Sequence, residues 1–214
     1  MTTTPPDTPP QDALVYVVDD DEAVRDSLGW LLEANGFAVR SFASAEDFLA
    51  HITGERSPGV SCLVADVRMP GMSGLELHDE MLRKGLEIPL IFITGHGDVP
   101  MAVASMKKGA ADFLEKPFND EQLCALVRDC LLRATTRQRT SAEDRRASER
   151  IEKLTQRERQ VLERIVAGRL NKQIADDLSI SIKTVEAHRA NIMDKLGART
   201  MADLMKTALR AGAS

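Results

Sequence analysis

Short apolar runs alternate with amphipathic stretches along the first 133 residues. Five of the runs are rich in β-branched residues and apolar on both sides, which is typical of parallel strands buried on both faces of a sheet. Stretches with helical spacing of apolar positions follow them. Five βα units in succession predict an α/β fold with a doubly wound, five-stranded parallel sheet. The predicted strands are 14–18, 38–41, 62–65, 90–93 and 112–114, and the predicted helices are 22–35, 45–52, 74–84, 99–108 and 121–133.

The C-terminal part of the chain has no strand pattern and predicts an all-α domain of four short helices. Thr155-Gln-Arg-Glu158 forms a capping box at its entry, and Gly168 and Gly197 stand where helices end. The predicted helices are 156–167, 171–178, 182–196 and 200–211.

Two polar segments separate or precede these domains. Residues 134–150 are rich in Ser, Thr and Arg without apolar periodicity, which predicts a linker, in part helical, rather than a packed core. Residues 1–12 are rich in Thr, Pro and Asp and predict a disordered leader. We therefore expect an N-terminal domain over 13–133 and a C-terminal domain over 151–214.

Charge is distributed unevenly between the two domains. Residues 1–133 hold 11 basic and 22 acidic side chains, whereas residues 150–214 hold 13 basic and 8 acidic ones. The basic half is a candidate for binding a polyanion such as DNA, although its excess of charge also fits an ordinary surface. No apolar run approaches the roughly 18 residues that cross a bilayer, so we expect no membrane association. The 3 cysteines lack C-x-x-C spacing and favour buried thiols in a reducing compartment.

Polar side chains follow the predicted strands at the points where chemistry is expected. Asp19 and Asp20 follow the first strand, Asp66 the third, Thr94 ends the fourth, and Lys116 follows the fifth. Because the carboxyl ends of parallel strands meet at one edge of a sheet, these groups should lie close together. Crowded carboxylates need a counter-charge, which a lysine and a hard divalent cation, Mg²⁺ foremost, would supply.

Residues 14–118 resemble the receiver domain of bacterial two-component response regulators. The motifs are VVDDDEAVR (17–25), LVADVRMPGMSG (63–74), ITGHGD (93–98) and EKPF (115–118), and ITGHGDVPMAV with DFLEKPF is similar to the FixJ subfamily. The resemblance implies the flavodoxin-like or CheY-like fold. It also implies that a sensor histidine kinase phosphorylates Asp66.

The resemblance implies further roles at this pocket. Mg²⁺ (or Mn²⁺) would be bound by the side chains of Asp20 and Asp66 and by the backbone carbonyl of Arg68, with Asp19 completing the pocket through water. A second set of residues would bind the phosphoryl oxygens and act as the switch: Thr94 and Lys116, with Phe113 as the switching aromatic residue.

Elementary electrostatics supports such a switch. An acyl phosphate carries roughly −2 where the carboxylate carried −1. Thr94 can then turn inward to the new oxygens and leave space for Phe113, which couples a local charge change to a distant surface.

Three other functions fit the sequence less well than a phosphorylated receiver domain. A haloacid-dehalogenase-type phosphohydrolase needs a second Asp two residues after its nucleophile, where this chain has Arg68. A ligand-binding front domain, as in quorum-sensing LuxR proteins, calls for a large apolar pocket rather than charged strand ends. A receiver without phosphorylation is disfavoured because Asp66, Thr94 and Lys116 are all present.

Residues 154–204 resemble the LuxR/NarL/FixJ-type helix-turn-helix domain, on LTQRERQVL, GRLNKQIADDLSIS and KTVEAHRANIMDKL. Helix 171–178 would be the scaffold, 179–181 the turn and 182–196 the recognition helix. We expect Arg157 and Arg159 to be solvated or to contact the receiver rather than to read bases. The candidate DNA contacts, to phosphates or to base edges, are Lys172, Lys183, Thr184, Glu186, Ala187, His188, Arg189 and Asn191.

Together these features predict a transcription factor of the bacterial cytoplasm that is controlled by phosphorylation. It would form a homodimer when phosphorylated and bind an inverted-repeat site on double-stranded DNA, with RNA polymerase as a further candidate partner. Its catalytic activity would be limited to autophosphatase activity at most.

Overall fold

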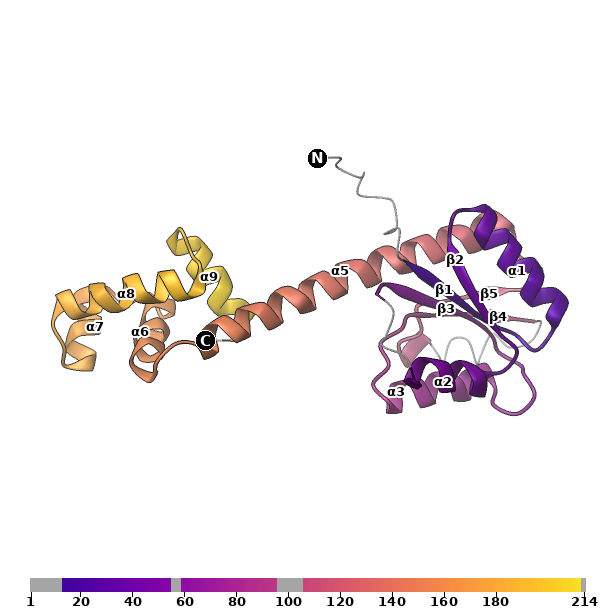
Figure 1. Ribbon diagram of the computed structural model, residues 1–214, viewed down its shortest axis with the longest axis horizontal. Coiled ribbons are helices and arrows are strands. Elements are labelled where there is room, and N and C mark those ends of the chain that lie inside the picture. The colour runs from indigo at the N-terminus through magenta and orange to yellow at the C-terminus, as the bar shows by residue number, and fades with distance from the viewer. Residues whose placement is uncertain (1–12, 55–58, 96–105, 213–214) are drawn as a thin grey trace. The chain divides into compact units, whose positions relative to one another are not determined.

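The computed structural model describes residues 13–54, 59–95 and 106–212, which fall into two compact units divided between Arg137 and Gln138 (Figure 1). The predicted leader, and most of the helix predicted over 99–108, lie outside the described residues. The first unit contains β1 (Leu14–Val18), α1 (Glu22–Ala34), β2 (Ala38–Phe42), α2 (Ala45–Gly54), β3 (Ser61–Asp66), α3 (Gly74–Arg83), β4 (Leu90–Thr94), β5 (Asp112–Glu115) and the start of α5 (Asp120–Glu152).

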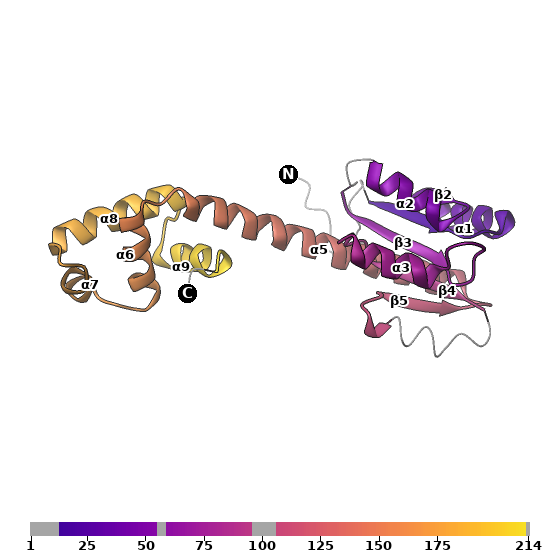
Figure 2. The ribbon, with the colours of Figure 1, turned by 90° about the horizontal axis from the view of Figure 1, so that it is seen from below.

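The sheet of the first unit is parallel throughout, in the order β2-β1-β3-β4-β5. This order confirms the predicted doubly wound fold. Helices α1 and α5 cover one face of the sheet, and α2 and α3 cover the other (Figures 1 and 2). The register aligns Val18 with Ala65 and Asp66 with Ile93, so the ends of β1, β3 and β4 lie side by side at one edge.

Alternate residues of each central strand enter two separate cores. Val15, Val17 and Val64 pack under α1 and α5, whereas Tyr16 and Leu63 pack under α2 and α3. Both sets are apolar because neither face is exposed to water. All three cysteines are buried free thiols, as expected for packing residues.

Helix α5 runs on to Glu152, so its predicted end at residue 133 is wrong. Residues 134–150 lack an apolar stripe, but they contain neither Gly nor Pro. The Thr135 and Thr136 hydroxyls donate to the carbonyls four residues earlier, which lets these side chains stay within the helix. A polar helix without breakers can therefore continue beyond the domain that nucleates it.

The last turns of α5 form part of the second unit. Ala147 is buried, Ile151 packs against the core of this unit, and the Arg150 guanidinium donates to the Leu196 carbonyl at 3.1 Å. The other helices are α6 (Gln156–Val166), α7 (Asn171–Leu178), α8 (Ile182–Leu196) and α9 (Met201–Arg210).

The second unit is all-α, and its helix ends match the predicted signals. Thr155 and Glu158 form the expected capping box, and Gly197 ends α8 with a φ of 64°. Val161, Ile174 and Val185 meet in its apolar core. Within the residues described, no helix combines the length and apolarity that a membrane span requires.

We predict that His78 makes the receiver unit less stable as pH falls. Its side chain is buried edge-on against Phe92, and burial lowers its pKa from the ordinary value near 6.5. The nearby charge of Asp79 raises this pKa by a smaller amount, and that of Lys108 lowers it further. Above pH 6.5 the imidazole is neutral whether folded or unfolded. Between that pH and the lowered pKa only the unfolded chain gains the proton, so stability falls.

Urea unfolding at pH 5.5, 6.5 and 7.5 tests this prediction. The wild type should lose more stability than His78→Leu between pH 7.5 and 5.5. Parallel pH profiles for the two proteins would contradict it.

Candidate functional site

Lys116 bridges two carboxylates at the carboxyl edge of the sheet. Its Nζ lies 2.7 Å from Asp66 Oδ1 and 3.3 Å from Asp19 Oδ2. Asp19 follows β1, Asp66 ends β3, and Lys116 follows β5, where its backbone N–H donates to the Thr94 carbonyl. The Lys116–Pro117 peptide bond is cis. The structure thus brings together three of the polar groups that the sequence placed at this edge.

The two acidic side chains are in different environments. Asp19 is 2 % exposed, and burial raises its pKa against the opposing effects of the Asp21 N–H and of Lys116. Asp66 is less enclosed, and its Oδ2 accepts from the Arg68 N–H at 2.7 Å. Burial would lower the pKa of Lys116, but its hydrogen bond to Asp66 and the charges of Asp66 and Asp19 raise it. The ammonium is therefore retained at neutral pH.

The acidic run at the end of β1 divides into three environments. Asp19 points into the pocket, Asp20 is exposed, and Asp21 caps α1 by accepting from the Ala23 N–H at 2.9 Å. Arg25 in α1 donates to the Asp19 backbone carbonyl at 2.7 Å. The sequence analysis missed Arg25, although its place one helical turn after the Asp21 cap was a signal.

The carboxylates of the pocket suit a hard cation. Among the described residues no group of three or more His, Cys, Asp and Glu side chains is arranged for a metal. Mg²⁺, however, is commonly held by one or two carboxylates, with water and other oxygens completing its octahedron. Asp66 and Asp19 share one lysine at this edge, and the exposed Asp20 follows Asp19 directly, so the carboxylates present fit a cation of this kind.

The predicted switch residues lie on β4 and β5. Thr94 is 1 % exposed at the end of β4 and pairs with Glu115 on β5. Phe113 is half-buried and packs against the core under α2 and α3, two residues before Glu115 on β5. Thr94 and Phe113 thus lie on neighbouring strands, two positions apart in register, and their role as a switch stays a prediction.

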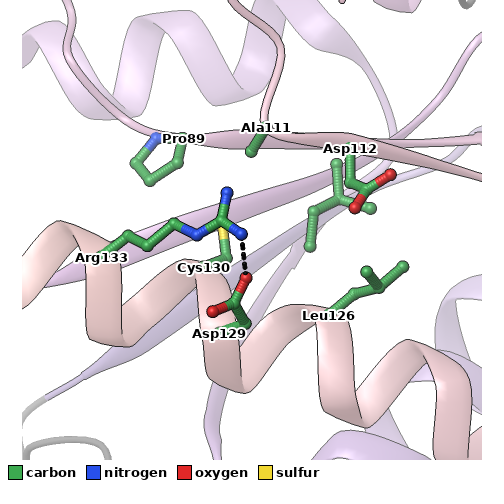
Figure 3. A pocket seen from close by; sticks show the side chains of 8 residues that line it. Pro89, Ala111, Asp112, Leu126, Asp129, Cys130 and Arg133 are labelled. Atoms are coloured by element: carbon green, nitrogen blue, oxygen red, sulfur yellow. Dashed lines mark ion pairs between the residues drawn. The ribbon is translucent and has the colours of Figure 1, made fainter.

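A small pocket lies at the opposite edge of the sheet and is not a site of this kind. Its volume of about 40 Å³ holds little more than water. Figure 3 shows Asp129 paired with Arg133 beside it, at 2.7 Å. It is lined by Pro89, Ile91, Ala111, Asp112, Leu126, Asp129, Cys130 and Arg133.

In the second unit, the candidate DNA contacts lie on α7 and α8 with different exposure. Thr184 is half-buried, and its backbone N–H donates to Ser181 Oγ, which caps α8. His188 and Arg189 are also half-buried, and Arg189 lies beside Met201 and lines an open pocket with Asn171. The exposed candidates are Lys172, Lys183, Glu186, Ala187 and Asn191.

The recognition helix is held by a buried ion pair. Lys195 Nζ of α8 lies 2.7 Å from Glu158 Oε2 of α6, whose side chain is only 4 % exposed. Burial raises the pKa of Glu158, but the hydrogen bonds from Lys195 and Thr155 outweigh it and lower that pKa overall. Arg157 is half-buried and donates to the Leu178 carbonyl at 2.5 Å, so it caps α7, a contact that the sequence did not predict.

A parallel sheet with a lysine-bridged aspartate pair, followed on the chain by a helix-turn-helix unit, defines a two-domain response regulator. Residues 15–128 match the response regulator receiver domain, and residues 152–208 match the bacterial regulatory proteins of the luxR family. The chain belongs to the two-component response regulators of the FixJ subfamily and is a phosphorylation-dependent transcription regulator. Its family is one of transcriptional regulators rather than of enzymes.

Similar proteins cover nearly the whole chain. The transcriptional regulatory protein FixJ of Azorhizobium caulinodans is 50% identical over 204 residues, 95% of both chains. FixJ of Rhizobium meliloti is 49% identical over 203 residues, 94% of this chain and 97% of its own. The solved structure of the response regulator StyR has a TM-score of 0.82 and 42% identity, covering 93% of this chain and 99% of its own.

Gly74→Ala is predicted to distort the site. A Cβ at this position would lie 2.2 Å from the Asp66 backbone oxygen, a contact that neither backbone can relieve without moving. We expect a loss of about 1–3 kcal/mol in unfolding free energy and slower phosphorylation of Asp66.

Gly54→Ala is the matched control, because a Cβ there meets no atom within 4 Å. Urea unfolding and phosphoryl labelling measure both variants. Equal stability and labelling of the two would show that the close approach is not needed.

Proposed function

We propose that Asp66 accepts a phosphoryl group from the phosphohistidine of a sensor histidine kinase. The observation that carries this proposal is the Lys116 ammonium in contact with both Asp66 and Asp19. An Asp66 oxygen forms the new O–P bond while the N–P bond of the donor breaks, and the bonding pair of electrons stays on the histidine nitrogen. Positioning and charge compensation dominate such transfers, and Lys116 offers both.

Receiver domains generally bind Mg²⁺, and we infer that the same pocket binds Mg²⁺ (or Mn²⁺) here. The proposed ligands are the side chains of Asp20 and Asp66 and the backbone carbonyl of Arg68, with Asp19 in the outer shell. When bound, the cation offsets the charge of the phosphoryl oxygens. The two carboxylates that share Lys116 support this assignment, because a second cation would offset the repulsion between them.

Phosphorylation then acts on Thr94 and Phe113. The phosphoryl group adds about one negative charge beside Lys116. The Thr94 hydroxyl, which donates to the Gly95 carbonyl at 3.3 Å, then turns to donate to the phosphoryl oxygens. Phe113, half-buried on the neighbouring strand, fills the space that Thr94 leaves. The transient acyl phosphate is finally lost to water, which is the autophosphatase activity we assign to the receiver.

The output is binding of double-stranded DNA by a phosphorylated homodimer. Two recognition helices related by a two-fold axis fit an inverted repeat. Lys172 and Lys183 are exposed and suit phosphates, whereas Glu186 and Asn191 suit base edges. RNA polymerase is a further partner of the bound dimer, and we place the protein in the bacterial cytoplasm, where the chromosome lies.

The other four candidate residues of α8 are expected to make weaker contacts with DNA. Thr184 is engaged at the helix start, Arg189 leans toward Met201, and both are half-buried. We assign phosphate contacts to Thr184 and His188, and a base or phosphate contact to Arg189. Ala187 would make an apolar contact with a thymine methyl group.

Acetyl phosphate with Mg²⁺ tests the phosphorylation step. Wild-type protein should gain a hydroxylamine-labile phosphoryl group at Asp66, become dimeric by light scattering and bind operator DNA more tightly. Asp66→Asn should do none of these. A wild-type protein that stays unlabelled, or a label on another residue, would overturn the proposal.

Substitutions on α8 test the DNA interface. Lys183→Ala should weaken binding to all sequences and reduce the slope of log K against log salt by about 1, because one phosphate contact is lost. Glu186→Ala should instead relax the preference at one base pair, by about 1–3 kcal/mol. Fluorescence anisotropy over a salt series measures both, and identical behaviour of the two variants would contradict the assignment.

A further inference from the structure

The segment that follows Asp66 forms a loop that brings the chain to α3. This phosphoacceptor loop, residues 67–73, is fixed at its two ends by backbone hydrogen bonds of 3.0 Å, from the Val67 N–H to the Ile93 carbonyl and from the Gly74 N–H to the Val67 carbonyl. It carries the Arg68 carbonyl that the proposed function assigns to the metal. Its outer half turns at Gly71, which has a φ of 73°.

Glu46 of α2 reaches across to the outer half of this loop. Its Oε1 accepts from the Met72 N–H at 3.0 Å, across 26 residues of sequence. The contact is tight, because a Cβ added at Gly71 would lie 2.9 Å from the same oxygen. Gly71 therefore permits the turn and also leaves space for the carboxylate.

Helix α2 is a firm base for this contact. Phe48 and Leu49 are buried in the core under the sheet, and Ser44 Oγ accepts from the Asp47 N–H at 3.1 Å at the start of the helix. Glu46 lies in the first turn of this helix, and its side chain is exposed, so the Met72 N–H is what holds its carboxylate. Through the hydrogen bond from Met72 to Glu46, the phosphoacceptor loop is therefore attached to a helix that packs on the sheet.

We propose that Glu46 is a positioning residue for the phosphoacceptor site: by holding the Met72 amide, it fixes the phosphoacceptor loop and so orients the Arg68 carbonyl toward the bound cation. The inference rests on the proposed function, because it assumes that Asp66 is phosphorylated with Mg²⁺ in this pocket. Outer-shell groups of this kind orient metal ligands without touching the metal. Glu46 has no contact with the reacting atoms and takes no part in the chemistry.

Four variants test the role of Glu46. Glu46→Ala removes the acceptor, and Glu46→Gln keeps an oxygen that can accept from the neutral N–H. Asp47→Ala removes one charge from the same exposed helical turn without touching the loop, so it controls for the effect of charge on the helix. Gly71→Ala displaces the carboxylate while leaving it in the chain, and it also strains the turn at a φ of 73°, so it tests the fixed loop geometry as a whole rather than the carboxylate alone.

Isothermal titration measures Mg²⁺ binding, and hydrogen exchange measures protection of the Met72 amide. Glu46→Ala and Gly71→Ala should each bind Mg²⁺ about ten-fold more weakly and lose protection at Met72. The Mg²⁺ affinity of Glu46→Gln and of Asp47→Ala should stay within about two-fold of the wild-type affinity. The Mg²⁺ concentration for half-maximal labelling by acetyl phosphate should rise in parallel, with a smaller change in the rate at saturating Mg²⁺.

The outcomes separate this inference from the function on which it rests. If wild-type protein is labelled at Asp66 but Glu46→Ala binds Mg²⁺ equally well, the positioning role is wrong and the function stands. If Glu46→Gln is as impaired as Glu46→Ala, the effect is one of charge and the hydrogen-bond argument fails. If wild-type protein takes no label at all, the proposed function fails first.

Discussion

The pocket depends on placing two carboxylates close together and keeping them there. Like charges repel, and burial disfavours each charge further, so the arrangement holds only if a cation is supplied within a few ångströms. Lys116 does this from β5, two strands beyond the end of β3. Because β4 lies between β3 and β5, the side chain of Lys116 has to reach past the end of β4 to contact Asp66. The long side chain of a lysine suits this position.

The strand order also decides which parts of the sequence can act together. Because β1 lies beside β3 and β4 beside β5, the residues after these strands converge although they are up to 97 positions apart. Every further group that stabilises the edge does so by contacting backbone. Arg25 holds the Asp19 carbonyl, Glu46 holds the Met72 amide, and Gly74 lets α3 approach the Asp66 carbonyl.

The sequence predicted the sheet and the pocket because each has a local signal. Strands with two apolar faces and polar residues at their ends can be recognised without tertiary contacts, and so can the capping box at Thr155. The length of α5 could not be predicted in this way, since a polar stretch without Gly or Pro is compatible with both a linker and a helix. The contacts of Arg25, Glu46 and Arg157 were not predicted for another reason. Each of these side chains binds a backbone group, and residue type does not show which backbone group a side chain will meet; only the helical position of Arg25 gave a hint.

Both units contain a lysine in contact with a buried carboxylate, but the two contacts differ in how many carboxylates share the lysine. In the second unit Glu158 is matched one-to-one with Lys195 and also accepts from Thr155, so its pKa is lowered and the charge is fully compensated. In the first unit one lysine serves two carboxylates, and the pKa of the buried Asp19 is raised. The one-to-one pair of Glu158 and Lys195 holds α8 against α6 and leaves no excess charge that would attract a further ion. Two carboxylates that share one lysine leave a remaining deficit of positive charge, and this deficit supports the cation site and the phosphoryl transfer that we propose for the receiver pocket.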